Sequence, residues 1–248
     1  MSSVSRGVRI AGRVIKGLFF AVIFSVIALL LWRVFTSGDP KSMQTLTPND
    51  ALAAAYEEKG EELSLFRQEQ RSITSGEDNY GYFSVTSCVF IPEANQVQIV
   101  VRYNNSTLRA LQADYDLAEV PSRDDELFDV SLTVATDLTP DDTEDNLGND
   151  PDSVKMTRVH PTSVTKERKQ MYNYRRLVFD LGTAELSLPQ LLEDGLLLAV
   201  YADIYYNEDI AYEEEPYGAL CLYTYMDKTL DVSLSKRDKQ ALNEYLDK

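Results

Sequence analysis

Histidine, cysteine and tryptophan are scarce in this chain of 248 residues, which contains one His, two Cys and one Trp. A single histidine, His160, cannot supply a His-His metal pair, so a histidine zinc site is excluded. Cys88 and Cys221 fit neither a Cys-x-x-Cys redox motif nor a disulfide-dense secreted scaffold. They can form at most one disulfide, and two reduced thiols in the core are the alternative.

Positive charge is also in short supply, with 24 Lys and Arg against 40 Asp and Glu and a net charge of −16. This balance excludes nucleic acid as a partner, because phosphate binding needs a basic surface. The charge is unevenly distributed. Residues 1–36 contain five basic and no acidic residues, which leaves 19 basic and 40 acidic residues, a net charge of −21, for the remainder.

One long apolar run stands near the amino terminus, where residues 17–32 contain no charged side chain. Extended by its apolar flanks to residues 14–35, it is long enough to cross a bilayer as a helix. Trp32 lies at one end, where an indole favours the membrane interface. A cleaved signal peptide is the alternative. We favour an anchor because Arg33 interrupts the cleavage region and no Ala-x-Ala follows.

Basic residues accumulate before the apolar run and set its expected orientation. By the positive-inside rule, residues 1–13 form a cytoplasmic tail and the rest of the chain is extracytoplasmic. The tail lies as a helix on anionic lipid or is unstructured; the sequence leaves both open. The expectation is thus a single-pass envelope protein that contacts membrane lipid through its N-terminal helix. The expected membrane residues are Arg6, Arg9, Arg13, Lys16, Trp32 and Arg33.

Helix signals flank the expected outer domain, residues 47–248, which follows a linker at residues 36–46. Thr47 reads as an N-cap, Pro48 as the first helical residue and Gly60 as the stop. Residues 61–71 are a second, weaker helix candidate. Ser235 and Asp238 form a capping box that opens a final helix.

Seven runs have the composition of β-strands and contain no proline. We therefore expect a mainly β protein, an antiparallel β-sandwich-like (Ig-like) domain with helices only at its two ends. An α+β domain with a bent sheet is the alternative. The runs are residues 80–91, 97–101, 128–136, 154–159, 171–181, 196–206 and 217–226.

Two acidic segments and one basic segment are the candidate binding regions. Residues 137–152 hold seven acids and no base, and calcium prefers such oxygen donors, although the EF-hand spacing fails. A solvated loop is the favoured interpretation, and no other cofactor is expected. The candidate metal ligands are Asp141, Asp142, Glu144, Asp145, Asp150 and Asp152.

The basic segment, residues 155–176, carries a net charge of +6 and is the only basic region outside the anchor. It could contact lipid phosphates, an anionic polymer or an acidic partner, or it could neutralise the acidic loops of the domain itself. It includes one of two Ser-x-x-Lys matches, Ser163 to Lys166 and Ser233 to Lys236. Both lack the companion motifs of an acyl-transfer enzyme.

Two classes of function follow. The favoured one is a membrane-anchored, non-catalytic binding or scaffolding module that contacts an envelope protein or polymer through sheet edges, loops or Tyr-rich strands. The alternative is an envelope hydrolase that uses paired carboxylates such as Asp203 and Glu208, since glycosidase chemistry needs two acids and no histidine.

Overall fold

The computed structural model describes residues 3–36, 38–68, 71–73, 83–114, 116–122, 128–138, 155–193, 197–206, 218–223 and 230–248. The chain divides into two compact units, Met1–Asp39 and Pro40–Lys248.

The first unit is a single helix, α1 (Ser3–Thr36). Its segment Ile15–Trp32 has a mean hydropathy of 2.4, and its side chains are exposed. At about 1.5 Å per residue, these 18 residues span about 27 Å, close to the hydrocarbon thickness of a bilayer. Length and composition are compatible with a membrane anchor or with a signal sequence. The helix begins at Ser3, so it also includes the basic tail.

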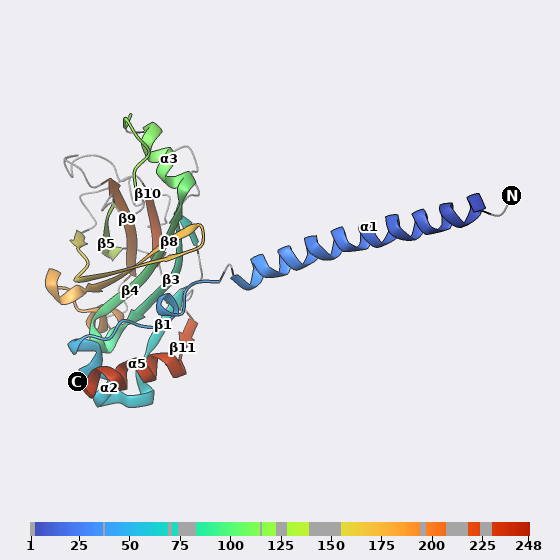
Figure 1. The fold of residues 1–248 in the computed structure, drawn as a ribbon. Coiled ribbons are helices and arrows are strands. Elements are labelled where there is room, and N and C mark those ends of the chain that lie inside the picture. The colour runs from blue at the N-terminus through green and yellow to red at the C-terminus, as the bar shows by residue number, and fades with distance from the viewer. Residues whose placement is uncertain are drawn as a thin grey trace. The chain divides into compact units, whose positions relative to one another are not determined.

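The second unit contains two antiparallel sheets (Figure 1). The larger has the order β11-β1-β3-β4-β8-β7, with β2 also paired to β3, and the smaller has the order β10-β9-β5-β6. The larger sheet consists of β1 (Leu65–Gln68), β2 (Arg71–Ile73), β3 (Phe83–Ile91), β4 (Gln96–Asn104), β7 (Ser163–Lys169), β8 (Tyr172–Asp180) and β11 (Leu230–Val232). The smaller consists of β5 (Phe128–Leu138), β6 (Lys155–Val159), β9 (Leu197–Tyr206) and β10 (Gly218–Tyr223).

The main core contains residues from both sheets. Alternate side chains of β4, such as Val97 and Ile99, join Leu132 of β5 and Val159 of β6 in one buried cluster. The alternation in β3 changes phase at a bulge between Val85 and Ser87, where the register with β4 shifts. Residues 83 and 85 before the bulge, and 88 and 90 after it, therefore lie in the same cluster.

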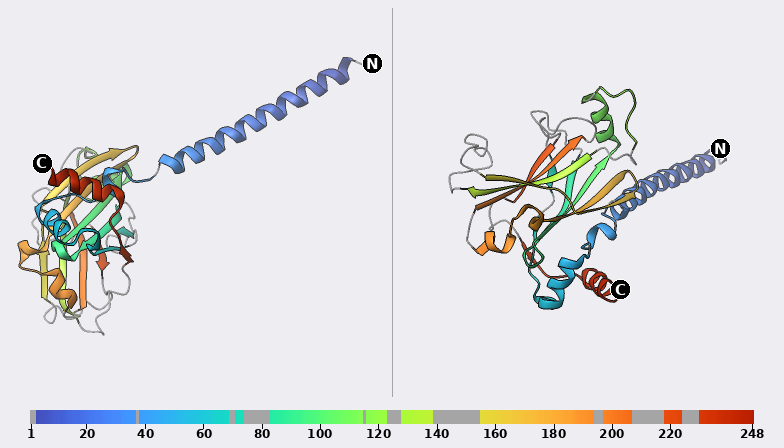
Figure 2. Two further views of the ribbon diagram at one scale, coloured as in Figure 1. Left: turned by 90° about the horizontal axis from the view of Figure 1, so that it is seen from below. Right: turned by 90° about the vertical axis from the view of Figure 1, so that its left-hand side faces the viewer.

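A second core lies on the other side of the larger sheet, where α2 (Asp50–Lys59) and α5 (Lys236–Leu246) pack side by side (Figure 1). Leu52 of α2 and Leu242 of α5 are fully buried with Ile91 of β3. Figure 2 shows α2 and α5 at one end of the unit and α3 (Asn105–Asp114) at the other. The short α4 (Leu188–Glu193) and the 3-10 turns η1 (Ser42–Gln44), η2 (Gly60–Glu62), η3 (Pro92–Ala94) and η4 (Leu181–Ala184) complete the elements.

The segment Pro40–Thr47, which follows α1, packs on the domain. Met43 is 1% exposed and lies with Val100 and Tyr174. The Gln98 side-chain amide both donates to Thr47 O (2.9 Å) and accepts from Thr47 N (2.8 Å), as a strand partner would. The sequence predicted a linker at residues 36–46. From Pro40 onward this region instead packs on the larger sheet as part of the second unit.

All seven strands expected from the sequence are present, with shifted ends. The class is α+β, which was the alternative expectation, and not mainly β, because α3 and α4 interrupt the strands instead of lying at the chain ends. The second helix expected at residues 61–71 is wrong. Leu63 and Leu65 are both 3% exposed and alternate into the core, and β1 pairs with β3 and β11. The strands β2, β7 and β11 were not expected.

Candidate functional site

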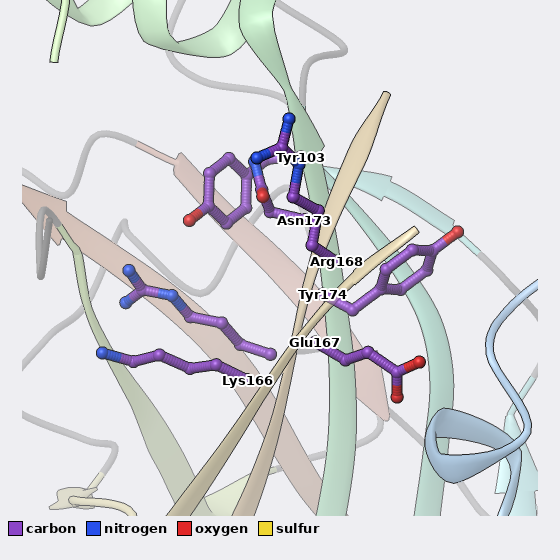
Figure 3. Close-up of a pocket in the computed structure, with 7 residues that line it drawn as sticks. Tyr103, Lys166, Glu167, Arg168, Asn173 and Tyr174 are labelled. Atoms are coloured by element: carbon purple, nitrogen blue, oxygen red, sulfur yellow. The ribbon is translucent and has the colours of Figure 1, made fainter. Parts of the chain in front are cut away.

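A cavity of about 250 Å³ opens at the β7 edge of the larger sheet (Figure 3). Its lining comes from three adjacent strands, β4, β8 and β7, and is rich in basic and aromatic side chains. The lining residues are Tyr103, Lys166, Glu167, Arg168, Asn173, Tyr174 and Arg175.

Strand register places the basic residues of this cavity in two rows across the sheet. Tyr103, Asn173 and Arg168 are direct neighbours on β4, β8 and β7. In the next row, Arg175 of β8 lies directly opposite Lys166 of β7. Because side chains on adjacent strands at paired positions share a face, three cations gather on one face of the sheet. Like charges at opposed positions repel, so an anion between them would be stabilising.

Glu167 and Tyr174 belong to the opposite face, because they occupy the intervening positions of β7 and β8. Figure 3 shows both side chains on the other side of the strands from Lys166 and Tyr103. The Glu167 carboxylate accepts a hydrogen bond from the Ser42 hydroxyl in the segment that follows α1. Among the described lining residues, those on the face that carries Lys166 and Arg168 include no carboxylate.

Two of the cavity residues are buried although they are polar. Arg175 and Asn173 are each 6% exposed, whereas Lys166 and Arg168 are exposed. The Arg175 guanidinium lies 5.7 Å from the centre of the Tyr103 ring, within the range of a cation–π contact. The cavity therefore has a buried polar floor and an exposed cationic rim of long side chains.

The side-chain nitrogen Nδ2 of Asn173 is buried and has no hydrogen-bond partner among the described residues. Leaving such a donor unsatisfied costs about 1–3 kcal/mol. The groups at this end of the cavity, an amide nitrogen, two guanidinium groups and an ammonium group, are hydrogen-bond donors. Their natural complement is a group rich in acceptor oxygens, such as a carboxylate or a phosphate.

Two further arginines of the segment 155–176 lie away from the cavity. Arg158 of β6 donates from Nε to the hydroxyl of Ser131 on β5 at 2.9 Å. Arg176 is 4% exposed on the opposite face of β8. Burial lowers the pKa of Arg176 to about 10, an effect that Asp238 opposes and Arg67 reinforces. One stretch of sequence thus divides between a surface cavity and a buried polar cluster.

That buried cluster is centred on Asp238, which is 2% exposed at the start of α5. Its carboxylate accepts from Leu46 N (2.7 Å), Ser235 N (3.0 Å) and the Ser235 hydroxyl (2.6 Å). These bonds tie the segment that follows α1 to the C-terminal helix. The capping box expected at Ser235 is confirmed.

The other candidate residues are not brought together. The acidic candidates Asp141, Asp142, Glu144, Asp145, Asp150 and Asp152 lie outside the described residues, as does Glu208. Asp203 is on β9, paired with Ser131 of β5. Ser163 and Lys166 occupy positions of opposite parity on β7 and therefore lie on opposite faces, which excludes a Ser-Lys pair there.

Cys88 is a free thiol, 1% exposed in the main core, and burial raises its pKa. Regular alternation along an unbroken strand predicts that Cys88 shares the less apolar face of Ser84 and Thr86. The bulge after Val85 reverses that phase. Cys221 lies on β10 of the smaller sheet, so the two cysteine strands are not neighbours in one sheet.

Sequence reasoning identified the basic segment but missed Tyr103 and Asn173. Tyr103 is about 70 residues away in sequence from Asn173, and only the register of β4 with β8 makes them neighbours. A scan against protein-family models, a search of curated proteins and a search of solved structures each found no match.

Proposed function

We propose that this chain is a membrane-anchored binding module whose outer domain holds an anionic group of an envelope protein or polymer in the β7–β8 cavity. The supporting observation is that Lys166, Arg168 and Arg175 line one cavity with Asn173, whose buried Nδ2 has no hydrogen-bond partner in the described part of the chain. Because the acidic surface elsewhere on the domain repels anions, a cluster of cations directs an anionic partner to this one site.

The proposal places α1 in the membrane as an uncleaved anchor, with the N-terminus cytoplasmic. Four basic residues precede its apolar segment and one, Arg33, follows it, a bias that keeps the N-terminal side in the cytoplasm. Protease added to intact cells should degrade the domain. In cells without protease, the whole chain should remain in the membrane fraction during alkaline extraction. A domain protected until the cells are permeabilised would reverse the orientation, and a chain that begins after residue 36 would identify a cleaved signal.

A finer description of the fold is part of this proposal. The core shared by residues of both sheets supports a sandwich-like arrangement. The helices on the outer face of the larger sheet and its strand order give no support to the Ig-like form of a sandwich.

Calorimetric titration of the full chain in phosphatidylcholine nanodiscs tests the cavity, with triglutamate and inorganic phosphate as probes. Two charge-assisted contacts are lost in Lys166→Gln/Arg168→Gln, so we expect at least about tenfold weaker binding. The matched control is Lys59→Gln/Lys248→Gln, which removes two exposed positive charges elsewhere and should bind as the parent does. Equal binding by both double variants would show that net charge, not the cavity, attracts the anion.

A further inference from the structure

The strand β7 is an edge strand of the larger sheet: β8 lies on one side of it, and no described strand lies on the other. Its side chains are mostly exposed. An edge strand offers backbone donors and acceptors to a further strand. In this sheet every described pairing is antiparallel. An added strand at this edge would therefore also be expected to run antiparallel to β7.

Three rows of side chains cross the sheet and end at this edge. The first ends at Arg168 and the second at Lys166, the two exposed cations of the cavity. The third row runs from Ile99 through Leu177 to Val164. The first two members of that row are buried, but Val164 is 45% exposed. The edge thus presents two cations and one uncovered apolar side chain on one face.

From this pattern we propose that the cavity takes its anionic groups from an extended acidic peptide segment that adds to the β7 edge. Directly opposed side chains on neighbouring strands lie about 5 Å apart, so each row dictates one residue of the incoming segment. Read antiparallel to β7, the segment has an acid opposite Arg168, an acid opposite Lys166 and an apolar residue opposite Val164. The recognised pattern is acid-x-acid-x-apolar. Main-chain hydrogen bonds supply affinity and the three rows supply specificity.

This inference rests on the proposed function, since it names the ligand of the same cavity. The probe is a seven-residue peptide, acetyl-Thr-Asp-Thr-Asp-Thr-Val-Thr-amide, titrated into the full chain in phosphatidylcholine nanodiscs. A peptide of the same composition with its two acids three residues apart is the matched control, because an extended segment would then place them on opposite faces. We expect the alternating peptide to bind at least tenfold more tightly.

Two N-methylated forms of the alternating peptide separate strand addition from simple charge attraction. In an added strand, one alternate set of backbone N–H groups points toward β7 and the other set points away. Methylating the first set should abolish binding, and methylating the second should leave it within about threefold. Equal binding by both forms would overturn strand addition and leave the anionic cavity intact. Failure of every anionic probe would instead overturn the proposed function.

Variants of β7 test the contribution of the apolar row and of the two cationic rows. Val164→Thr keeps the shape of the side chain and replaces one methyl group with a hydroxyl group. Affinity should therefore fall severalfold for the valine peptide and not for a peptide with Thr in that position. Lys166→Gln/Arg168→Gln should lose binding of the alternating peptide. Sedimentation of the parent chain gives the last outcome. A dimer to which the alternating peptide does not bind would assign the β7 edge to a second copy of this chain and overturn the proposal.

Discussion

Asp238 is a buried charge whose role is structural. Its carboxylate holds three donors and lies near the buried cation of Arg176. Removing the carboxylate takes away the helix cap and leaves the buried Leu46 N–H without its acceptor. We expect Asp238→Ala to lower the free energy of unfolding by about 2–4 kcal/mol, measured by urea denaturation.

The control for that substitution is Gln240→Ala, an exposed position two residues further along α5. It should change stability by less than about 0.5 kcal/mol. Similar losses in both variants would indicate that helix propensity, not the buried carboxylate, stabilises this end of the domain.

Cys88 makes stability depend on alkaline pH. Its folded-state pKa lies above the ordinary value near 9, so the unfolded chain releases the proton first. The contribution of the neutral thiol is complete below about pH 9 and is lost as pH rises. Between about pH 9 and 10, the unfolding free energy of the parent should fall by about 1 kcal/mol more than that of Cys88→Ala. Parallel curves would contradict a buried thiol.

At the scale of single elements, the start of α2 shows how tertiary contacts choose between two caps. The sequence favoured Thr47 as N-cap, but Asn49 caps the helix and accepts from Leu52 N at 3.0 Å. The Gln98 side chain forms hydrogen bonds with the backbone N and O of Thr47. The Gln96 amide donates to Asn49 Oδ1 at 2.9 Å. The helix ends at Gly60 as predicted, and its φ of 59° with ψ of −123° is a backbone conformation that favours glycine.

The cap assignment makes a direct prediction. Asn49→Ala removes the helix cap and the partner of Gln96, so it should destabilise the domain by about 1–2 kcal/mol in urea denaturation. Thr47→Ala is the matched comparison. Its backbone bonds to Gln98 persist, so its cost should stay below about 0.5 kcal/mol. The reverse order of costs would restore Thr47 as the cap.

Two other elements were not predicted from the sequence. The helix α3 could have been found, since the Asn104 side chain accepts from Ser106 N and Thr107 N, and Leu108 and Leu111 follow at helical spacing. The strand β7 carries no such local signal, because a mostly charged and hydroxyl-bearing run lacks the alternation of a half-buried strand. Pairing with β8 determines its conformation.

At the scale of the whole molecule, the segment Pro40–Thr47 follows the N-terminal helix in the chain but belongs to the domain. Its burial of Met43 and Leu46, and its bonds to Asp238 and Gln98, make it part of the fold. A chain that begins at Gly38 should keep its melting temperature. A chain that begins at Pro48 should melt about 10 °C lower in a calorimetric scan, because apolar burial and these bonds are lost.

Equal melting temperatures for these two shortened chains would show that Pro40–Thr47 is only a tether. A chain beginning at Gly38 that fails to fold would instead show that α1 itself stabilises the domain. Both outcomes would contradict the division of the chain at residue 39 into separate compact units.

The sequence by itself determined the apolar helix, the seven hydrophobic strands, the capping box at Ser235 and the stop at Gly60, because each depends on local periodicity or on the conformational limits of one residue. Only the tertiary structure decided the face of Cys88, the conformation of β1 and β7 and the membership of the cationic cavity. These features depend on a bulge and on strand register, which join residues that are distant in the chain and leave no local pattern.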